Sequence, residues 1–267
     1  MTNFVITTRG DIEIGYFPVL EQYGVVHGFT LRHHGQSDIV KGTLNMALHV
    51  GDDPQKVLAN RAKVAQALGY EPGRVTTCAQ VHGNKVVEVT PELVGRGAFD
   101  YGNTIQGTDG LITKEKQVPL MLFFADCVPV MLVDTKSSAF ALAHAGWRGA
   151  VTSIGAVALK AMEQKFGTKA CNVIAAIGPS IGPCCYEVDD TVLNKAENYK
   201  ECFTPTGPHH WHLNLWQVNR LQLERMGVPS EQILDSSYCT HDHVEQYFSY
   251  RAEQGKTGRL AAVIYRK

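Results

Sequence analysis

Three features are missing from this sequence of 267 residues, and each absence excludes a class of protein. No run of lysine or arginine stands out and the formal net charge is −1, so binding to nucleic acid or to a membrane surface has no electrostatic support. No apolar stretch approaches the roughly 20 residues that span a bilayer. The first ten residues lack the basic and apolar regions of a secretion signal, which predicts a cytoplasmic location.

The cysteines lack the patterns that indicate disulfides or a zinc finger. They are odd in number and include no C-x-x-C pair, which is typical of reduced thiols in a cytoplasm. The seven positions are Cys78, Cys127, Cys171, Cys184, Cys185, Cys202 and Cys239. The rest of the composition is that of a soluble globular protein, with 44% hydrophobic and 19% charged residues. Because no repeat, low-complexity tract or linker is present, we expect one domain over residues 1–267, and a monomer.

Hydrophobic periodicity of about 3.6 residues predicts three helices, at 54–68, 150–166 and 215–226. The first has Asp52 and Asp53 as candidate capping residues and ends at Gly69, and the third has Asn214 as a candidate capping residue. Runs rich in β-branched and aromatic residues predict strands. These runs are Val25–Thr30, Val75–Gln80, Lys85–Val89, Leu120–Phe124, Pro129–Val133, Phe140–Ala143, Val173–Ile177 and Leu260–Ile264.

The grouping of these strands favours an α+β fold over a doubly wound parallel sheet, since strands and helices do not alternate strictly. Residues 81–84, which contain Gly83-Asn84, predict a tight turn that pairs 75–80 with 85–89 as a hairpin.

Three segments share one pattern, in which a predicted apolar strand ends and is followed by Gly, His, Cys or Asp. They are CAQVHGN (78–84), FFADCVPVMLVD (123–134) and AHAGWRG (143–149). The end of a strand on a rigid sheet is a good position for a ligand, and each segment supplies one donor: His82, Cys127 or His144. Two histidines and one cysteine form a zinc set with an open fourth position, as in catalytic sites. The alternative interpretation is a buried cysteine and two histidines that bond loop carbonyls, since the spacing is long.

Other histidines and cysteines lie closer together in the sequence than His82, Cys127 and His144 do. His209, His210 and His212 follow a loop-like composition and are interpreted as a solvated loop. His241 and His243 follow Cys239-Thr240, and a role at the rim of a site stays open for them. The pair Cys184-Cys185 lies in IGPSIGPCCYEVDD (177–190), where we favour a shape-determining turn over redox chemistry.

Three arginines, Arg61, Arg148 and Arg251, could stack or pair with carboxylates, or could converge on a phosphate or carboxylate. Asp109 and Asp126 are carboxylates that could orient a histidine or bind a hydroxyl. For Asp109, which precedes a glycine, capping of a turn is the alternative.

Nine segments together resemble one family, and they run in its order from about residue 27 to 259. They are LNMALHVGDD (44–53), CAQVHGN, GTDGLIT (107–113), FFADCVPVMLVD, AHAGWRG, IGPSIGPCCYEVDD, NRLQLERMGV (219–228), Cys239-Thr240 and FSYR (248–251). On these motifs the chain resembles the YfiH/YlmD family, also called the polyphenol-oxidase or laccase-domain family and described as purine nucleoside phosphorylases. ADC followed by AHAGWRG is the most specific part of the match.

The resemblance implies a fold, a metal site and an activity. The fold is a four-layer α/β/β/α sandwich, similar to a bacterial toxin deamidase domain with a cysteine nucleophile. The family's zinc ligands fall on His82, Cys127 and His144. The activities are phosphorolysis of adenosine, inosine, guanosine and methylthioadenosine, with adenosine deamination in addition.

For such an enzyme we expect one zinc ion per chain, with a nucleoside and phosphate as its partners. Zinc would activate water for attack on adenine, and cationic side chains would hold the phosphate. Arg61, Arg148 and Arg251 are the candidates for phosphate, and Asn45, Gln80 and Asp109 are further candidates for contact with substrate.

Three other hypotheses stay open at this stage. A copper-dependent phenol oxidase is disfavoured, because multicopper oxidases need several His-x-His segments and only His241-x-His243 is present. A cysteine hydrolase or amidase acting on cell-wall precursors would use Cys127 as nucleophile and His144 as base. A non-enzymatic protein would use the zinc ion structurally.

Overall fold

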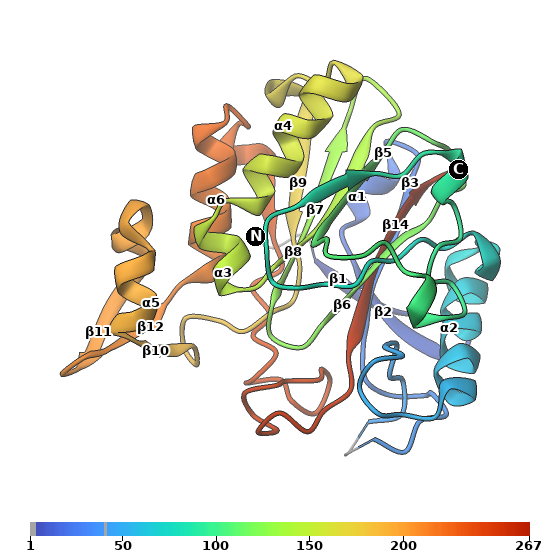
Figure 1. Ribbon diagram of the computed structural model, residues 1–267, viewed down its shortest axis with the longest axis horizontal. Helices are drawn as coiled ribbons and strands as arrows, with labels where there is room; N and C mark the ends of the chain where they lie inside the picture. The colour runs from blue at the N-terminus through green and yellow to red at the C-terminus, as the bar shows by residue number, and fades with distance from the viewer. Residues whose placement is uncertain (1–3, 40–41) are drawn as a thin grey trace.

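The computed structural model describes residues 4–39 and 42–267, which form two large sheets, a small sheet and several helices (Figure 1). The five-stranded sheet contains β1 (Val5–Arg9), β2 (Ile12–Tyr16), β3 (Val25–Thr30), β14 (Leu260–Arg266) and β6 (Leu120–Phe124), in that order. All of its neighbouring strands are antiparallel. The chain's last strand therefore lies in the middle of this sheet, between β3 and β6.

The six-stranded sheet is mixed. Its order is β13 (Ile233–Asp235), β9 (Val173–Ile177), β7 (Val128–Asp134), β8 (Phe140–Ala145), β5 (Gly110–Thr113) and β4 (Val86–Glu88). The pairs at its two edges, β13 with β9 and β4 with β5, are parallel, and the inner pairs are antiparallel. Strands β7, β8 and β9 are buried along their whole length, which explains their nearly continuous hydrophobic sequence.

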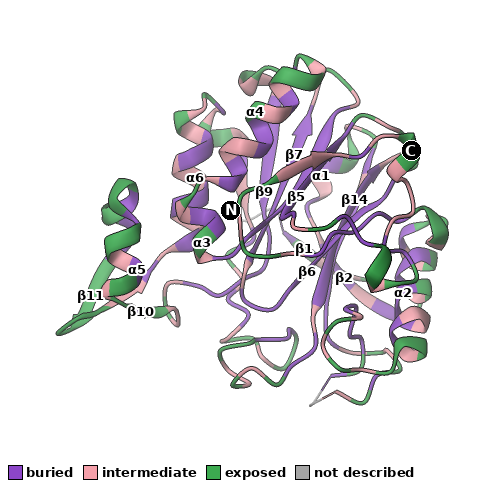
Figure 2. Cartoon of the chain, viewed as in Figure 1, coloured by how far each residue is buried: buried purple, intermediate pink, exposed green. Residues whose placement is uncertain are grey.

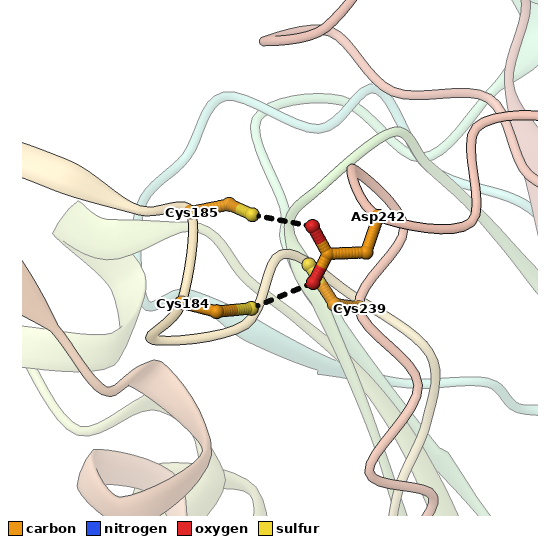
Figure 3. A group of neighbouring side chains, drawn as sticks. All are labelled: Cys184, Cys185, Cys239 and Asp242. Atoms are coloured by element: carbon orange, nitrogen blue, oxygen red, sulfur yellow. Dashed lines mark hydrogen bonds between the residues drawn. The ribbon is translucent and has the colours of Figure 1, made fainter.

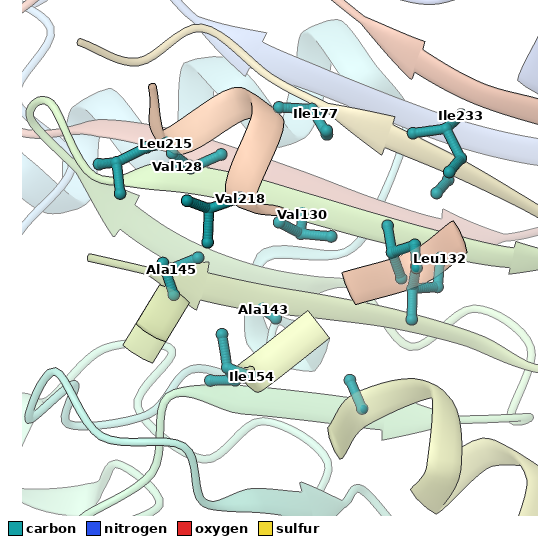
Figure 4. Close-up of a cluster of buried hydrophobic side chains, with 14 of the residues drawn as sticks. Val128, Val130, Leu132, Ala143, Ala145, Ile154, Ile177, Leu215, Val218 and Ile233 are labelled. Atoms are coloured by element: carbon teal, nitrogen blue, oxygen red, sulfur yellow. The ribbon is translucent and has the colours of Figure 1, made fainter. Parts of the chain in front are cut away.

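Both faces of each of the two large sheets carry buried hydrophobic residues, so each face packs against another element. One face of the six-stranded sheet packs on α3 (Trp147–Val151), α4 (Ile154–Phe166) and α6 (Leu215–Arg225), through side chains such as Val130 and Val218 (Figure 4). Its other face meets the five-stranded sheet, where Phe124 and Leu142 belong to one buried cluster. The far face of the five-stranded sheet packs against α2 (Pro54–Leu68) through Val64 and neighbouring residues.

A smaller unit extends from one side of the molecule (Figure 1). It contains the sheet β10 (Glu187–Asp189), β12 (His210–Leu213) and β11 (Phe203–Gly207), together with α5 (Asp190–Lys195). Figure 2 shows that this unit is more exposed than the two large sheets. The short helix α1 (Pro18–Glu21) connects β2 to β3.

The predicted α+β class is confirmed, and helix 54–68 and strands 25–30, 120–124 and 173–177 have the predicted bounds. Of the two candidate caps of helix 54–68, Asp53 is the N-cap, and Asn214 caps α6 as predicted, since both side chains accept hydrogen bonds from backbone N–H groups of their helices. The predicted helix 150–166 is divided instead into α3 and α4. Ser153 between them has a left-handed backbone with φ of 63°, which ends one helix before the next begins.

The predicted hairpin of 75–80 with 85–89 is wrong. Residues 75–80 form only isolated bridges, to Leu120 and Ile105, and β4 pairs in parallel with β5. Backbone N–H groups of the segment 81–84 donate to the buried carboxylate of Asp109. This tertiary contact takes the place of the predicted local hairpin. The loop predicted at 209–212 is also wrong in part, because His210 and His212 belong to strand β12.

Within residues 4–39 and 42–267, no helix has the length and apolar character needed to cross a membrane.

A candidate metal centre and the cavity beside it

The three donors that the sequence analysis singled out lie together. One ligand atom from each of His82, Cys127 and His144 lies within 4.8 Å of the other two. His144 belongs to β8, and Cys127 immediately precedes β7, the strand that pairs with β8. His82 comes from the segment before β4, and its ring lies edge-on to that of His144 with the centroids 4.8 Å apart. Residues separated by up to 62 positions (144 − 82) therefore form one cluster.

Asp109 holds two of these donors in place. Its carboxylate accepts the backbone N–H groups of Val81, His82 and Gly83 at 3.1, 2.9 and 2.8 Å. Its Oδ1 also lies 2.9 Å from Nδ1 of His144. A carboxylate that binds one ring nitrogen of a histidine leaves the other nitrogen free for a metal and orients the ring. Asp109, which is fully buried, therefore positions His144 directly and His82 through its backbone.

Gly146 keeps the space between the three donors open. A Cβ atom at this position would lie 2.9 Å from Cδ2 of His82 and 3.0 Å from Sγ of Cys127. Tetrahedral zinc with bonds of about 2.0 Å to nitrogen and 2.3 Å to sulfur has its ligand atoms roughly 3.3–3.8 Å apart. The spacing of the donors and the absence of a side chain at Gly146 fit an ion of this size.

The electrostatics of the pair Cys127–His144 are those of a thiolate beside an imidazolium. Burial alone would raise the pKa of Cys127, but His144 and a hydrogen bond with it lower this pKa to about 6. Burial would lower the pKa of His144, but Cys127 and Asp109 raise it to about 9. The thiolate is the form of cysteine that binds metals and acts as a nucleophile.

Asp126 connects the metal centre to two distant segments. Its Oδ1 accepts the hydroxyl of Thr240 at 2.7 Å, and its Oδ2 accepts the backbone N–H of Arg251 at 2.7 Å. Its backbone has a left-handed φ of 80°, which is costly for a residue other than glycine and is often found at functional sites. The turn that presents Cys127 is therefore fixed by contacts from the C-terminal part of the chain.

The three donors open into a cavity of about 540 Å³, within the range of small-molecule sites. Its wall carries aromatic rings, three arginines and few acidic groups. The lining residues are His49, Gln80, His82, Phe123, Ala125, Asp126, Cys127, His144, Trp147, Arg148, Ile181, Tyr186, Leu215, Tyr250, Arg251 and Arg259.

Three of the six predicted substrate contacts lie on this wall: Gln80, Arg148 and Arg251. The side-chain amide of Gln80 is largely occupied by the backbone of Phe123, donating to its carbonyl at 2.8 Å and accepting its N–H at 2.9 Å. Arg148 and Arg251 are exposed, so their guanidinium groups are accessible from the cavity.

The other three predicted contacts, Asn45, Arg61 and Asp109, are buried and are not among the lining residues of the cavity. Arg61 is buried in α2 and donates to the carbonyls of Met46, Gly97 and Ala98. Asn45 is fully buried, and its side-chain oxygen accepts the backbone N–H of Arg259. Polar side chains of this kind satisfy backbone groups of loops that border a site.

Sequence reasoning did not identify several residues of the wall. Arg259 immediately precedes β14 and lies outside the motifs of the sequence analysis, so no motif marked it. Tyr186 and Tyr250 lie inside quoted motifs, next to Cys185 and Arg251, and adjacency to those residues was the available signal. His241 and His243, for which a rim position was considered, are not among the lining residues in the described part of the chain.

Comparison with known proteins agrees with this geometry. The family model described as multi-copper polyphenol oxidoreductase laccase matches residues 26–267. A curated relative, purine nucleoside phosphorylase YlmD of Geobacillus stearothermophilus, is 40% identical over 264 residues, which are 97% of this chain and 95% of the relative. The crystal structure of YlmD from Geobacillus stearothermophilus superposes with a TM-score of 0.95 at 38% identity, covering 100% of both chains.

A second solved structure, that of the Bacillus licheniformis hypothetical protein YfiH, superposes with a TM-score of 0.94 at 35% identity, covering 98% of this chain and 99% of that one. At these identities and coverages the similarity extends over the whole fold. The predicted family is thereby confirmed, and the chain belongs to the YfiH/YlmD family of laccase-domain proteins.

Proposed function

We propose that this protein is a zinc-dependent purine nucleoside phosphorylase that also deaminates adenosine. Its substrates would be adenosine, inosine, guanosine and methylthioadenosine, with phosphate as the second substrate. The observation that carries the proposal is the cluster His82, Cys127 and His144 at a cavity whose wall also bears three arginines. The name purine nucleoside phosphorylase of the curated relative supports the same reaction.

The metal would be held by the two histidines and Cys127. When bound, zinc supplies a Lewis acid and leaves a fourth position for water or substrate. The chain's own contribution is to hold the three donors before the metal arrives, through Asp109 and the turn at Asp126. A copper ion is less favoured, since a set of one thiolate and two imidazoles with an open position is common for catalytic zinc.

Phosphate binding is assigned to Arg148, Arg251 and Arg259. Each guanidinium lies over a neighbouring aromatic ring, at 4.6 Å from Trp147, 5.1 Å from Tyr186 and 5.6 Å from Tyr250 respectively. Stacking of this kind restrains an arginine without using its N–H groups. Nη1 of Arg251 and Nη1 of Arg259 donate to backbone carbonyls, so an anion would be bound by the other N–H groups of these side chains. Arginine binds phosphate with paired hydrogen bonds, so three of them around one cavity suit a phosphate substrate.

The reaction itself requires few covalent steps from the protein. An oxygen of hydrogen phosphate forms a bond to C1′ of the ribose, the bond from C1′ to the purine nitrogen breaks, and the proton that the phosphate loses is taken up by the leaving purine, directly or through solvent. Held arginines favour this step by orienting the nucleophile and balancing its charge. In deamination a water oxygen would bond to C6 of adenine and ammonia would leave.

A cytoplasmic monomer fits this role and belongs to the same proposal. All seven cysteines, which lie within the described residues, are free thiols, as expected for a reducing compartment.

The test is to incubate purified protein with inosine or adenosine, with and without phosphate, and to separate the products by liquid chromatography. We expect free base only when phosphate is present, inosine from adenosine in either condition, and loss of both products in the Cys127→Ser variant. Exposed Cys171→Ser is the matched control and should retain activity. Release of base that does not depend on phosphate would contradict the proposed phosphorolysis.

A laccase-like phenol oxidase is the second candidate, because the family model carries that description. A site of two histidines and one cysteine also occurs in copper proteins. Metal analysis and oxidation of a phenol dye by the same preparation distinguish the two. Copper in the protein together with dye oxidation and no release of base would favour the oxidase, whereas activity that survives chelators and is lost on alkylation would favour a cysteine hydrolase.

A further inference from the structure

A second group of metal-binding side chains lies outside the site described above. Cys184, Cys185, Cys239 and Asp242 each offer one ligand atom, and these atoms all lie within 4.8 Å of one another. Figure 3 shows the two vicinal cysteines on one side of the group and Asp242 with Cys239 on the other. None of these four residues lines the cavity or contributes to the first metal centre.

Hydrogen bonds connect Asp242 to both vicinal cysteines. The carboxylate of Asp242 accepts the thiol of Cys184 at 3.0 Å on Oδ2 and the thiol of Cys185 at 2.8 Å on Oδ1 (Figure 3). The sulfur of Cys239 accepts the backbone N–H of Gly182 at 3.2 Å. Three sulfurs and a carboxylate therefore point to one place.

The backbone brings the two segments together independently of these side chains. Ser180 and Cys239 form a parallel bridge, in which Thr240 donates its N–H to the carbonyl of Ser180 at 3.0 Å. Gly182 allows the close approach, since a Cβ there would lie 3.1 Å from both Sγ of Cys184 and Cβ of Cys239. The positions of the cysteines are thus set by the fold of the segments that follow β9 and β13.

We propose that Cys184, Cys185, Cys239 and Asp242 bind a second zinc ion. Three thiolates and one carboxylate provide four ligands, which is the closed tetrahedral arrangement of structural zinc sites. Thiolate donors select zinc over magnesium or calcium. On binding, each of the three thiols would lose its proton to solvent, and the metal would replace the two thiol protons now donated to Asp242.

Such an ion would fix part of the cavity wall. Tyr186 follows Cys185 directly and lines the cavity. Thr240 follows Cys239 directly and donates its hydroxyl to Asp126, the residue before Cys127. A metal that joins the two segments would therefore hold the wall near the first metal centre from behind, without contacting substrate.

The experiment measures zinc per chain by mass spectrometry of the metal, after expression in zinc-supplemented medium and purification without chelators. We expect two ions in the unaltered protein and one in the Cys184→Ser/Cys185→Ser variant. In a Cys127→Ser background, which removes the first ion, we expect one ion, and none when Cys184→Ser and Cys185→Ser are added. This background separates failure of the second site from failure of the proposed catalytic site.

Controls cover misfolding and oxidation. Cys171→Ser removes an exposed cysteine outside the cluster and should retain two ions, and Asp242→Asn tests the site through a single exposed residue if the double variant does not fold.

Cobalt substitution should give a stronger thiolate charge-transfer absorption in Cys127→Ser than in Cys184→Ser/Cys185→Ser, since three sulfur ligands would remain in the first variant and one in the second. Equal zinc content with and without Cys184 and Cys185 would overturn the proposal. So would a disulfide within the cluster, detected as five free thiols instead of seven in denatured protein.

Discussion

At the scale of single residues, the candidate site depends on groups that are not themselves metal donors. Asp109 receives three backbone N–H groups and one ring nitrogen, and this hydrogen bonding lowers its pKa in spite of the burial that would raise it. Gly146 contributes only the absence of a side chain. The geometry of the candidate site therefore depends on a buried carboxylate and on the space beside Gly146 as much as on the donors His82, Cys127 and His144.

The substitution Gly146→Ala tests the importance of that volume. The added methyl group would lie about 3 Å from both Cys127 and His82, so the donors would have to separate. Because the backbone φ of Gly146 is −63°, alanine adds no backbone strain, and the fold should be retained. We expect zinc affinity to fall about 10-fold to 100-fold, as for other changes that move a ligand, measured by competition with a chromogenic chelator.

The control is Gly207→Ala, because among the described residues no atom lies within 4 Å of a Cβ added at that position. Unchanged zinc affinity in Gly146→Ala would mean that the donors are held farther from Gly146 in solution, and the interpretation of this glycine would be wrong.

At the scale of elements, strand β3 carries a histidine that is held neutral. His27 is buried, and its Nε2 accepts the backbone N–H of Phe17 at 2.9 Å. Burial, with Arg9 nearby, lowers the pKa of His27 to about 3. This side chain connects the end of β2 to β3 only in its unprotonated form, since a protonated imidazole cannot accept that hydrogen bond.

The pH dependence of stability follows from this shift. The pKa of His27 in the folded protein lies below the ordinary value of about 6.5, so its contribution to stability is complete above pH 6.5 and is lost progressively as the pH falls toward 3. Within this window the free energy of unfolding falls by about 1.4 kcal/mol for each pH unit. At pH 5 the protein should therefore be less stable than at pH 6.5 by roughly 2 kcal/mol through His27 alone. Urea unfolding at pH 7 and pH 5 should therefore show a smaller loss of stability on acidification in His27→Gln than in the unaltered protein.

His210→Gln is the matched control, because His210 is an exposed histidine on β12. An equal loss on acidification in His27→Gln and the unaltered protein would exclude His27 as the source of the acid sensitivity.

At the scale of the whole molecule, the cavity is assembled from both large sheets and from the segments between them. His144 comes from the six-stranded sheet, Phe123 comes from β6 of the five-stranded sheet, and Arg251 lies in the segment before β14. Arg251 is held there by its own contacts, donating to the carbonyl of Glu187 at 2.9 Å and to Asp126 through its backbone. Assembly of this cavity therefore requires the packing of the entire fold.

Removal of Arg251 should affect phosphate more than nucleoside. In Arg251→Ala, a charged hydrogen-bond donor worth about 1.5–3 kcal/mol is lost, so we expect KM for phosphate to rise about 10-fold to 100-fold. KM for inosine should change less than threefold. Both KM values are measured by steady-state kinetics in which each substrate is varied in turn. The control variant is Arg225→Ala, because Arg225 is an exposed arginine at the end of α6. A larger rise in KM for inosine would instead assign Arg251 to the nucleoside.

Local pattern was sufficient to predict much of the architecture. The helix 54–68 and the strands of the core follow from apolar periodicity and caps, because burial of one helical face or of a whole strand leaves a direct mark on the sequence. The motifs around His82, Cys127 and His144 also predicted this candidate donor set, through resemblance and not through spacing, and the structure places the three side chains close together. The hairpin at 81–84 could not be judged locally, since the N–H groups of that turn bind Asp109, a residue 26 to 28 positions away.

The amino-acid sequence by itself determined the α+β class and the family, and it predicted the three candidate donors that the structure places close together. Only the tertiary structure decided which polar residues face the cavity. Arg259 lies on the wall, whereas Asn45, Arg61 and Asp109 are buried and do not line it. The tertiary structure also brought Cys184 and Cys185 close to Cys239 and Asp242. The physical reason is that donors and charged groups act through distances of a few ångströms. Such distances are set by strand register and loop packing between segments far apart in the chain.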